Sequence, residues 1–359
     1  MAKKLASDKV LFTTVCFLVV FGLVMVYSAS AGLARGQAWN PFFIRQATAA
    51  AIGFAGLLVA MHTPYHVFKQ PKVVFALVAG AVVLLLLVLT QPPINGTRRW
   101  FLLGPISVQA SELAKLVVVP FLAFQIDQHE EQVNRREFLL PTLFVIGLIA
   151  ALVLAGPDLG TAVLMVAVAA VLIFLAGLAW RYVVVSGVLL GLLLTLGIFS
   201  ADYRTARLMA FLDPEKYPTT IGYQALQSLI AVGSGGLFGR GQGQSVQKLY
   251  YLPHPESDFI FSIVAEELGL LGGLFVLALF GVLLWRGFRA AAKAPDRFGR
   301  YLALGLTCLL VVQALINIGV TIALLPTKGI PLPFISYGGS SLVVAMTLSG
   351  MLLNVSEHG

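Results

Sequence analysis

Long apolar runs separated by short polar breaks dominate the sequence. The runs at 10–26, 73–89, 139–154 and 183–199 contain no charged residue. Each is close to the roughly 17–25 residues that a helix needs to cross a hydrocarbon layer about 30 Å thick. The pattern of runs and breaks therefore predicts about ten transmembrane helices. Their approximate ranges are 11–30, 42–61, 73–90, 111–127, 139–156, 160–178, 183–200, 259–285, 302–325 and 336–355.

Composition agrees with a chain embedded in a membrane. Of the 359 residues, 58% are hydrophobic and 11% are charged, whereas soluble domains carry about 25% charged and 45–50% apolar residues. No separate soluble domain is expected. We predict one all-α integral membrane domain over residues 1–359, with a single long loop at 201–258. Cys16 and Cys308 lie inside apolar runs, where packing is expected rather than a disulfide or a metal site.

The net charge of +8 comes from Lys and Arg residues that are scattered between the apolar runs. This scatter argues against a nucleic-acid partner and fits membrane topology, in which positive loops stay inside. With both termini in the cytoplasm, more of the basic residues fall inside than outside. The segment 201–258 then lies outside. Its sequence predicts short amphipathic helices on the membrane surface, one of them over 222–232.

Charged residues beside the fourth predicted span allow two interpretations. Ionisable side chains are costly inside a bilayer, so those within or next to spans are functional candidates. Glu112 and Lys115 are three residues apart and share a helix face, which favours an internal ion pair that makes both charges tolerable. The alternative is a cationic phosphate site made by Arg98, Arg99 and Lys115, because Arg offers bidentate donors and Lys a compact charge.

Two aspartates lie at the predicted outer ends of spans. Asp158, in the turn before 160–178, is either a cap of that helix or a site residue. Asp258 lies where the long loop meets an apolar helix, so desolvation is expected to raise its pKa and nearby cations to lower it. A carboxylate there suits a general base, although aspartate is also a favoured helix N-cap. Both roles stay open from the residue chemistry alone.

Two further stretches are irregular. The glycine-rich run 233–243 matches neither the dinucleotide fingerprint nor the phosphate-binding loop, so it predicts only flexible backbone near a polar headgroup. Near the end of the chain, Pro326, Pro331 and Pro333 cannot continue a helix. The backbone is therefore expected to break at the outer membrane edge, against protein or water.

Taken together, these motifs resemble the SEDS family (shape, elongation, division and sporulation). The resemblance covers nearly the whole chain, at 24–28, 95–115, 157–161, 222–247, 252–269 and 326–341. It implies a ten-helix fold and a glycosyltransferase that polymerises lipid II at the outer face of a bacterial cytoplasmic membrane. Ala110 and Gly156 depart from the family pattern, which has proline and glutamine there, but neither change removes a charged group. The stretches 245–252 and 326–330 are more similar to the division branch, FtsW, than to the elongation branch, RodA.

The resemblance places Asp258 at the position of the family's essential carboxylate. It implies that Asp258 takes the proton of the lipid II acceptor hydroxyl as this oxygen attacks a glycan carried on undecaprenyl pyrophosphate. Cationic residues, or a divalent cation such as Mg²⁺ or Mn²⁺, would stabilise the leaving pyrophosphate, and no nucleotide is required. The expected substrate-binding residues are Arg98, Arg99, Glu112, Lys115, Asp158, Gln247, Lys328 and Ser336.

Two other functions fit parts of the pattern. Broken helices and intramembrane charges also suit a transporter that flips lipid II, and a third hypothesis is a scaffold that only recruits a transpeptidase. The outside position of Asp258 favours the enzyme over a transporter, and a scaffold leaves the phosphate-suited cations unexplained. The expected partners are a class B penicillin-binding protein transpeptidase and membrane proteins of the divisome or elongasome.

Overall fold

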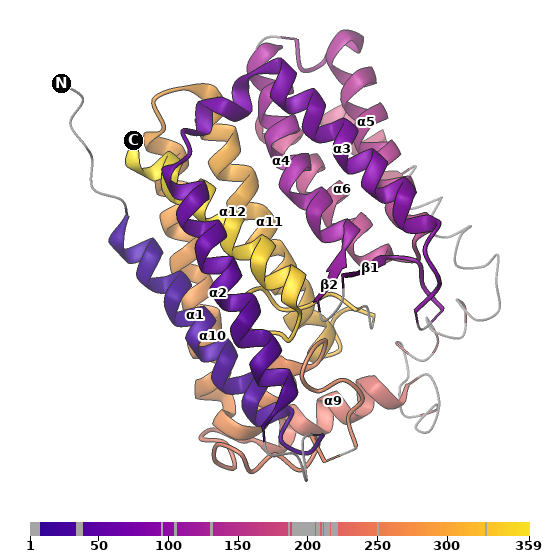
Figure 1. Cartoon of the computed structure of the whole chain (residues 1–359), viewed down its shortest axis with the longest axis vertical. Helices are drawn as coiled ribbons and strands as arrows, with labels where there is room; N and C mark the ends of the chain where they lie inside the picture. Colours follow the sequence, from indigo (N-terminus) through magenta and orange to yellow (C-terminus); the bar gives the residue numbers. More distant parts are fainter. Residues whose placement is uncertain are drawn as a thin grey trace.

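The protein is built from long helices whose bounds follow the apolar runs (Figure 1). The computed structural model describes residues 8–33, 39–94, 96–103, 106–129, 132–185, 187–188, 205, 209, 211, 216, 222–249, 251–326 and 329–359. The elements are α1 (Lys9–Ala29), α2 (Pro41–His62), the 3-10 helix η1 (Tyr65–Lys69), α3 (Pro71–Leu89), β1 (Trp100–Leu103), β2 (Ile106–Gln109), α4 (Ala110–Gln128), α5 (Arg136–Ala155), α6 (Leu159–Leu175), α9 (Tyr223–Ser234), α10 (Ile260–Lys293), α11 (Arg297–Thr321) and α12 (Gly339–Glu357).

The helices confirm most of the predicted spans. Nine of the ten coincide with a helix in the described part of the chain, and the remaining one, 183–200, lies mostly outside it. Seven described helices are long and apolar enough to cross a membrane. The predicted surface helix over 222–232 is α9. The chain is therefore a multi-pass membrane protein whose described part is mainly helical.

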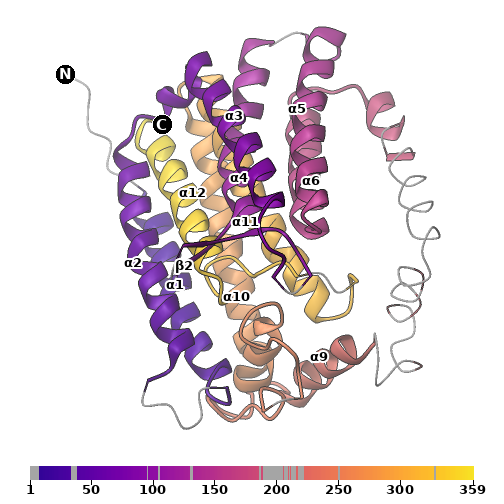
Figure 2. The ribbon, with the colours of Figure 1, turned by 45° about the vertical axis from the view of Figure 1, so that its right-hand side comes forward.

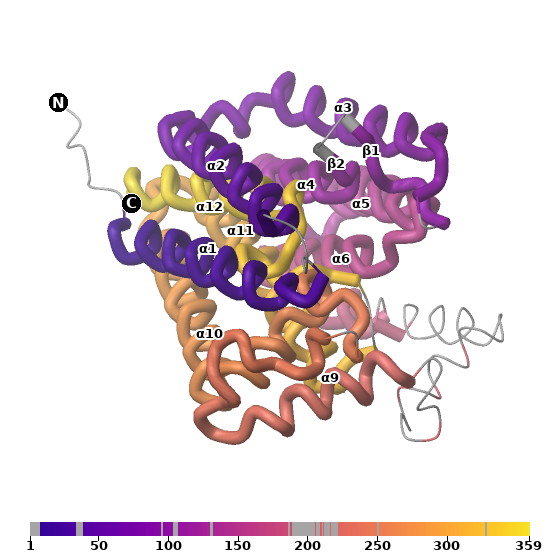
Figure 3. The backbone as a smooth tube through the Cα atoms, turned by 60° about the horizontal axis from the view of Figure 1, so that its bottom comes forward, coloured from indigo at the N-terminus to yellow at the C-terminus, as the bar shows by residue number. Residues whose placement is uncertain are grey.

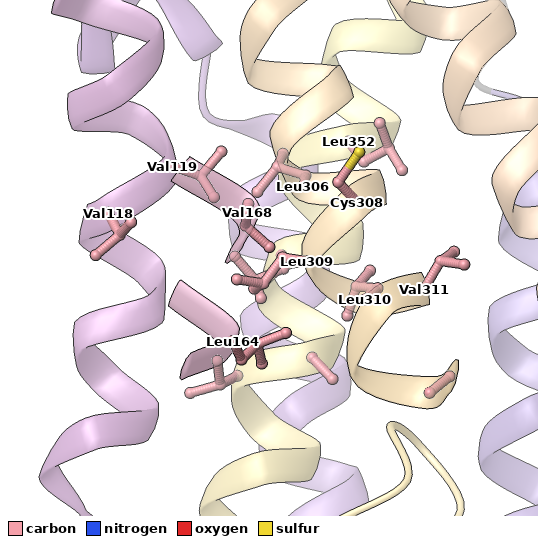
Figure 4. Close-up of a cluster of buried hydrophobic side chains, with 14 of the residues drawn as sticks. Val118, Val119, Leu164, Val168, Leu306, Cys308, Leu309, Leu310, Val311 and Leu352 are labelled. Carbon is pink, nitrogen blue, oxygen red and sulfur yellow. The ribbon is translucent and has the colours of Figure 1, made fainter. Parts of the chain in front are cut away.

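The last two helices form the centre of the bundle (Figure 2). In α11 and in α12, 78% of the most apolar 18-residue stretch is buried, whereas the corresponding share in α2 and in α3 is 28%. Helix α12 packs along α2, and α11 packs against α10 and α4. Between them, Val119, Leu164, Leu309 and Leu352 from four helices meet in an aliphatic cluster (Figure 4). Cys308 lies in the same cluster, in the packing role that its apolar run predicts.

The two faces of the bundle differ. Helix α1 begins and α12 ends at one face, whereas α9 lies at the opposite face (Figures 1 and 2). Figure 3, turned toward that opposite face, shows α9 beside α10, and the two helices are in contact. The loop segments that carry the candidate chemistry therefore approach the bundle from the α9 side.

A short hairpin interrupts the helices. Strands β1 and β2 pair antiparallel, with Trp100 opposite Gln109 and Leu103 opposite Ile106. Strand β2 also contacts α12. The sequence analysis did not anticipate the hairpin, because two four-residue strands give too short an alternation to stand out between apolar runs. The hairpin returns the chain to the bundle, and α4 begins at the residue after β2.

Helix α10 is broken at Gly269, and the glycine-rich run 233–243 forms hydrogen bonds with the backbone groups at the break. Gly269 has φ 68° and ψ −165°, a conformation that only glycine adopts readily. The expectation that 233–243 is merely flexible backbone is therefore wrong: its amides and carbonyls pair with the groups that the break frees from the helix. The bonds run from Arg240 N to Glu266 O (3.0 Å), Gly241 N to Glu267 O (3.0 Å), Leu270 N to Gly236 O (2.9 Å) and Leu271 N to Leu237 O (3.3 Å).

The two glutamates at this break are buried and paired. Glu267 accepts hydrogen bonds from Ser28 Oγ at 2.7 Å and from Lys248 Nζ at 2.7 Å. Glu266 accepts from Ser245 Oγ at 2.6 Å and from the amide of residue 246 at 3.0 Å. These contacts fix the segment between α9 and α10 to α1 and to α10, directly before the residues around Asp258.

Candidate functional site

Asp258 lies two residues before helix α10 and is half-buried. The N-cap position of α10 is Phe259, and no side chain among the described residues caps the helix. The capping interpretation of Asp258 is therefore wrong, because its carboxylate does not satisfy the orphan amides of the helix start. The carboxylate is left available for other chemistry.

The proline-broken segment before α12 lies against the Asp258 loop. Ser336 Oγ donates to the carbonyl oxygen of Ser257 at 2.6 Å, and Tyr337 N donates to the carbonyl oxygen of Glu256 at 2.8 Å. Gly329 completes this contact, because a Cβ added to it would lie 3.2 Å from Asp258 Oδ2. Two loops that are distant in sequence thus form one wall around the carboxylate. A side chain at position 329 would crowd it.

The surroundings of Asp258 raise its pKa. Burial is the main cause and disfavours the charged form. His254 and Arg99 lower the pKa, Glu256 raises it, and a hydrogen bond involving Ser257 lowers it, with a raised pKa as the net result. A carboxylate with a raised pKa is a stronger base, when ionised, than an ordinary aspartate.

Polar atoms near Asp258 are left without a protein partner. Arg99 Nε, Glu256 Oε2 and Asn317 Oδ1 are buried and lack a hydrogen-bond partner among the described residues. All three residues either bond to Asp258 or act on its charge. Because buried polar atoms are nearly always paired, this site is chemically suited to a polar ligand. No three His, Cys, Asp or Glu side chains in the described ranges gather closely enough to hold a metal ion.

The predicted cationic group divides between surface and interior. Arg99 acts electrostatically on Asp258, and Arg98 is exposed, with Nη1 3.3 Å from the carbonyl oxygen of Leu89. Lys115 is buried, 2.7 Å from Glu112 Oε2. The predicted internal ion pair is therefore present. Lys115 Nζ also donates to Gln313 Oε1 at 2.9 Å, which places it inside the bundle rather than at the surface.

The other predicted residues have different surroundings. Asp158 caps α6 by accepting from Thr161 N at 3.1 Å, as the capping interpretation predicts. It also accepts from Ser111 Oγ at 2.6 Å, which joins α6 to α4. The backbone N–H of Gln247 donates to Glu266 Oε2 at 3.3 Å, close to the break in α10. Lys328 lies outside the described residues.

Sequence reasoning missed two carboxamides that contact this site. Gln313 Nε2 donates to the carbonyl oxygen of Pro331 at 2.8 Å. Asn317 Nδ2 donates to the carbonyl oxygens of Asp258 at 2.9 Å and Ile330 at 2.8 Å. Two polar amides four residues apart in an apolar helix are a detectable signal. They escaped notice because an amide in an apolar helix is informative only when the segment that it contacts is known, and these contacts join residues that are far apart in the sequence.

Comparison with known proteins identifies the family. The family model described as cell cycle protein, which groups FtsW, RodA and SpoVE, matches residues 8–359. The chain belongs to this family. The resemblance to the SEDS family that the motifs indicated is thereby confirmed.

Relatives of known name cover almost the whole chain. A probable peptidoglycan glycosyltransferase FtsW from Geobacter sp. (strain M18) is 41% identical over 98% of this chain and 97% of its own length. Stage V sporulation protein E of Bacillus subtilis (strain 168) is 41% identical over 99% of this chain and 98% of its own length.

Solved structures share the fold. The rod shape determining protein RodA of Thermus thermophilus is 29% identical with a TM-score of 0.69, covering 98% of this chain and 97% of that one. A chain from a structure on the coordination of polymerization and crosslinking by a peptidoglycan synthase complex is 29% identical with a TM-score of 0.82, covering 98% of both chains.

The buried ion pair makes a prediction about stability. Lys115→Met should lower the free energy of unfolding by about 3–5 kcal/mol, because it leaves the buried Glu112 charge without its partner. Thermal unfolding of the purified protein in detergent measures the effect. The double variant Glu112→Gln with Lys115→Met removes both charges and should regain most of the loss. Equal stability of Lys115→Met and the unsubstituted protein would contradict an internal role for this pair.

Proposed function

We propose that this protein is a peptidoglycan glycosyltransferase that polymerises lipid II at the outer face of the bacterial cytoplasmic membrane. The observation that carries the proposal is the Asp258 carboxylate, which does not cap α10, has a raised pKa and is acted on electrostatically by Arg99. The names of the full-length relatives, which include peptidoglycan glycosyltransferase FtsW, support this activity.

The reaction follows from the charges around Asp258. Asp258 accepts the proton of the lipid II acceptor hydroxyl as the hydroxyl oxygen forms a bond to the anomeric carbon of the growing glycan. The bond from that carbon to the undecaprenyl pyrophosphate breaks, and the electron pair leaves with the pyrophosphate. Arg99 and the exposed Arg98 are suited to stabilise the negative charge that develops on this leaving group.

The remaining predicted binding residues take roles according to their surroundings. Lys115 and Glu112 pair within the bundle, and Lys115 also bonds to Gln313, which contacts the proline-broken segment. Asp158 joins α6 to α4 beside the arginines. Ser336 holds the proline-broken segment on Ser257. Gln247 and Lys328 stay in the proposal as headgroup contacts on the strength of the family resemblance alone.

The biological setting is the second part of the proposal. Relatives at 41% identity carry division and sporulation names, whereas the RodA structure is 29% identical. This difference favours septal over elongation synthesis. A class B penicillin-binding protein is the partner that we propose, because a structural neighbour belongs to a synthase complex that couples polymerization with crosslinking. Other divisome proteins are expected to bind the same assembly.

The proposed topology places the α9 face outside and both termini in the cytoplasm. We expect a cysteine at position 240, whose native Arg side chain is 42% exposed, to react with a membrane-impermeant maleimide in intact cells. A cysteine at position 293, at the end of α10, should react only after the cells are opened. Both substitutions are made in a chain with Cys16 and Cys308 replaced by alanine. The opposite labelling pattern would place Asp258 in the cytoplasm and contradict the proposal.

Removing the proposed base tests the activity itself. Asp258→Asn keeps the size of the side chain but not its basicity, so polymerisation of purified lipid II should fall by about 10²- to 10⁴-fold. Glycan strands are measured with the protein alone and with its transpeptidase partner. The thermal midpoint at neutral pH should be unchanged or higher. The reason is that a raised pKa means that the ionised form of Asp258 costs folding stability, which asparagine does not.

A matched carboxylate serves as the control. Asp296 accepts hydrogen bonds at the opposite face of the bundle, from Tyr65 at 3.2 Å and from the amide of Gly299 at 2.7 Å. Asp296→Asn should therefore leave glycan synthesis per folded molecule close to that of the unsubstituted protein. Near-normal synthesis by Asp258→Asn would leave a transporter or a scaffold as the better account.

A further inference from the structure

Helix α11 presents two buried carboxamides to the site. Gln313 and Asn317 are four residues apart, so they lie on one face of the helix. Their exposed fractions are 2% and 1%. Buried amides in an apolar helix are costly unless they are hydrogen-bonded, so their bonding shows what they hold in place.

The Asn317 amide joins the two loops around the carboxylate. Its Nδ2 donates one hydrogen to the carbonyl oxygen of Asp258 at 2.9 Å and the other to that of Ile330 at 2.8 Å. Ile330 follows Gly329, the residue whose added Cβ would lie 3.2 Å from Asp258 Oδ2. A single NH₂ group therefore sets the spacing between the backbone of Asp258 and the segment that faces its carboxylate.

Gln313 supports the same segment one residue further along. Its Nε2 donates to the carbonyl oxygen of Pro331 at 2.8 Å, and its Oε1 accepts from Lys115 Nζ at 2.9 Å. Because a cation faces the oxygen, the NH₂ group is held toward Pro331. Pro331 and Pro333 have no N–H, so this stretch depends on outside donors for order.

We propose that Asn317 is a positioning residue for Asp258, supported by Gln313 and the Glu112–Lys115 ion pair. This inference rests on the proposed function, since the NH₂ group of Asn317 affects the reaction only through the Asp258 carboxylate that it positions. It also gives the buried ion pair a purpose: Lys115 fixes the orientation of the Gln313 amide, which in turn holds the segment that Asn317 joins to Asp258.

The test separates positioning from folding. In Asn317→Ala the Asp258 loop loses its bond to α11, and a displacement of about 1 Å from the reactive geometry can cost on the order of 10²-fold in rate. We expect kcat for lipid II polymerisation to fall by roughly 10- to 100-fold, with KM unchanged because the arginines are untouched. Asn317→Ser, which keeps a shorter donor, should recover part of the loss in kcat.

A matched control exists at the other face of the bundle. Asn354 on α12 is 3% exposed and likewise joins two segments, donating to Met61 O at 2.7 Å and accepting from Tyr65 N at 2.9 Å. Asn354→Ala should reduce thermal stability as much as Asn317→Ala does, but leave kcat per folded molecule intact.

Three outcomes would overturn the inference. One is an Asn317→Ala enzyme whose kcat equals that of Asn354→Ala. The second is a loss carried by KM alone. The third applies if Asn317→Ala does not fold. In that case Asn317→Ser is measured instead, and a kcat equal to that of the unsubstituted protein would overturn the inference. Loss of activity in Asp258→Asn together with full kcat in the Asn317 variants would reject only the positioning role. Full activity in Asp258→Asn would reject the proposed function itself.

Discussion

A chain that leaves the helical conformation inside a membrane bundle must find partners for the backbone groups that it frees. The Asp258 loop and the proline-broken segment before α12 both face this constraint, and they meet it together. Side chains from α11 and from the segment itself donate to their carbonyl oxygens, as Asn317 does for Asp258 and Ser336 does for Ser257. The donors that satisfy the backbone therefore also fix the geometry around the carboxylate. The geometry of the site therefore follows from the hydrogen bonds that the two non-helical segments require.

The same constraint explains the segment between α9 and α10. Helix α10 opens at Gly269, and the glycine-rich run accepts and donates the hydrogen bonds that the open turn cannot make. Buried pairs such as Lys248 with Glu267, 2.7 Å apart, then hold the loop on the bundle. The loop reaches Asp258 from this anchored point. The carboxylate that we propose as the base thus rests on anchored backbone, as preorganised catalysis requires.

The sequence predicted the helices well because each span depends mainly on its own residues. The same locality allowed the Glu112–Lys115 pair and the Asp158 cap to be anticipated, since both are fixed by spacing along one helix. The roles of Gln313, Asn317 and the run 233–243 could not be read in this way. Their partners are distant in sequence, and amides or glycines become informative only when the segments opposite them are known. The hairpin at β1 and β2 was missed because its strands are too short to show alternation.

The pH dependence of polymerisation by the unsubstituted protein tests the central claim most directly. A base must be ionised, so activity is lost as pH falls through the pKa of Asp258. Burial holds that pKa above the ordinary aspartate value of about 3.9, with His254, Arg99 and Glu256 as the other charges that act on it. We predict an acid limb in kcat/KM with a midpoint above this value, and no such limb in the residual activity of Asp258→Asn. The same acid limb in both proteins would contradict the assignment of Asp258 as the base.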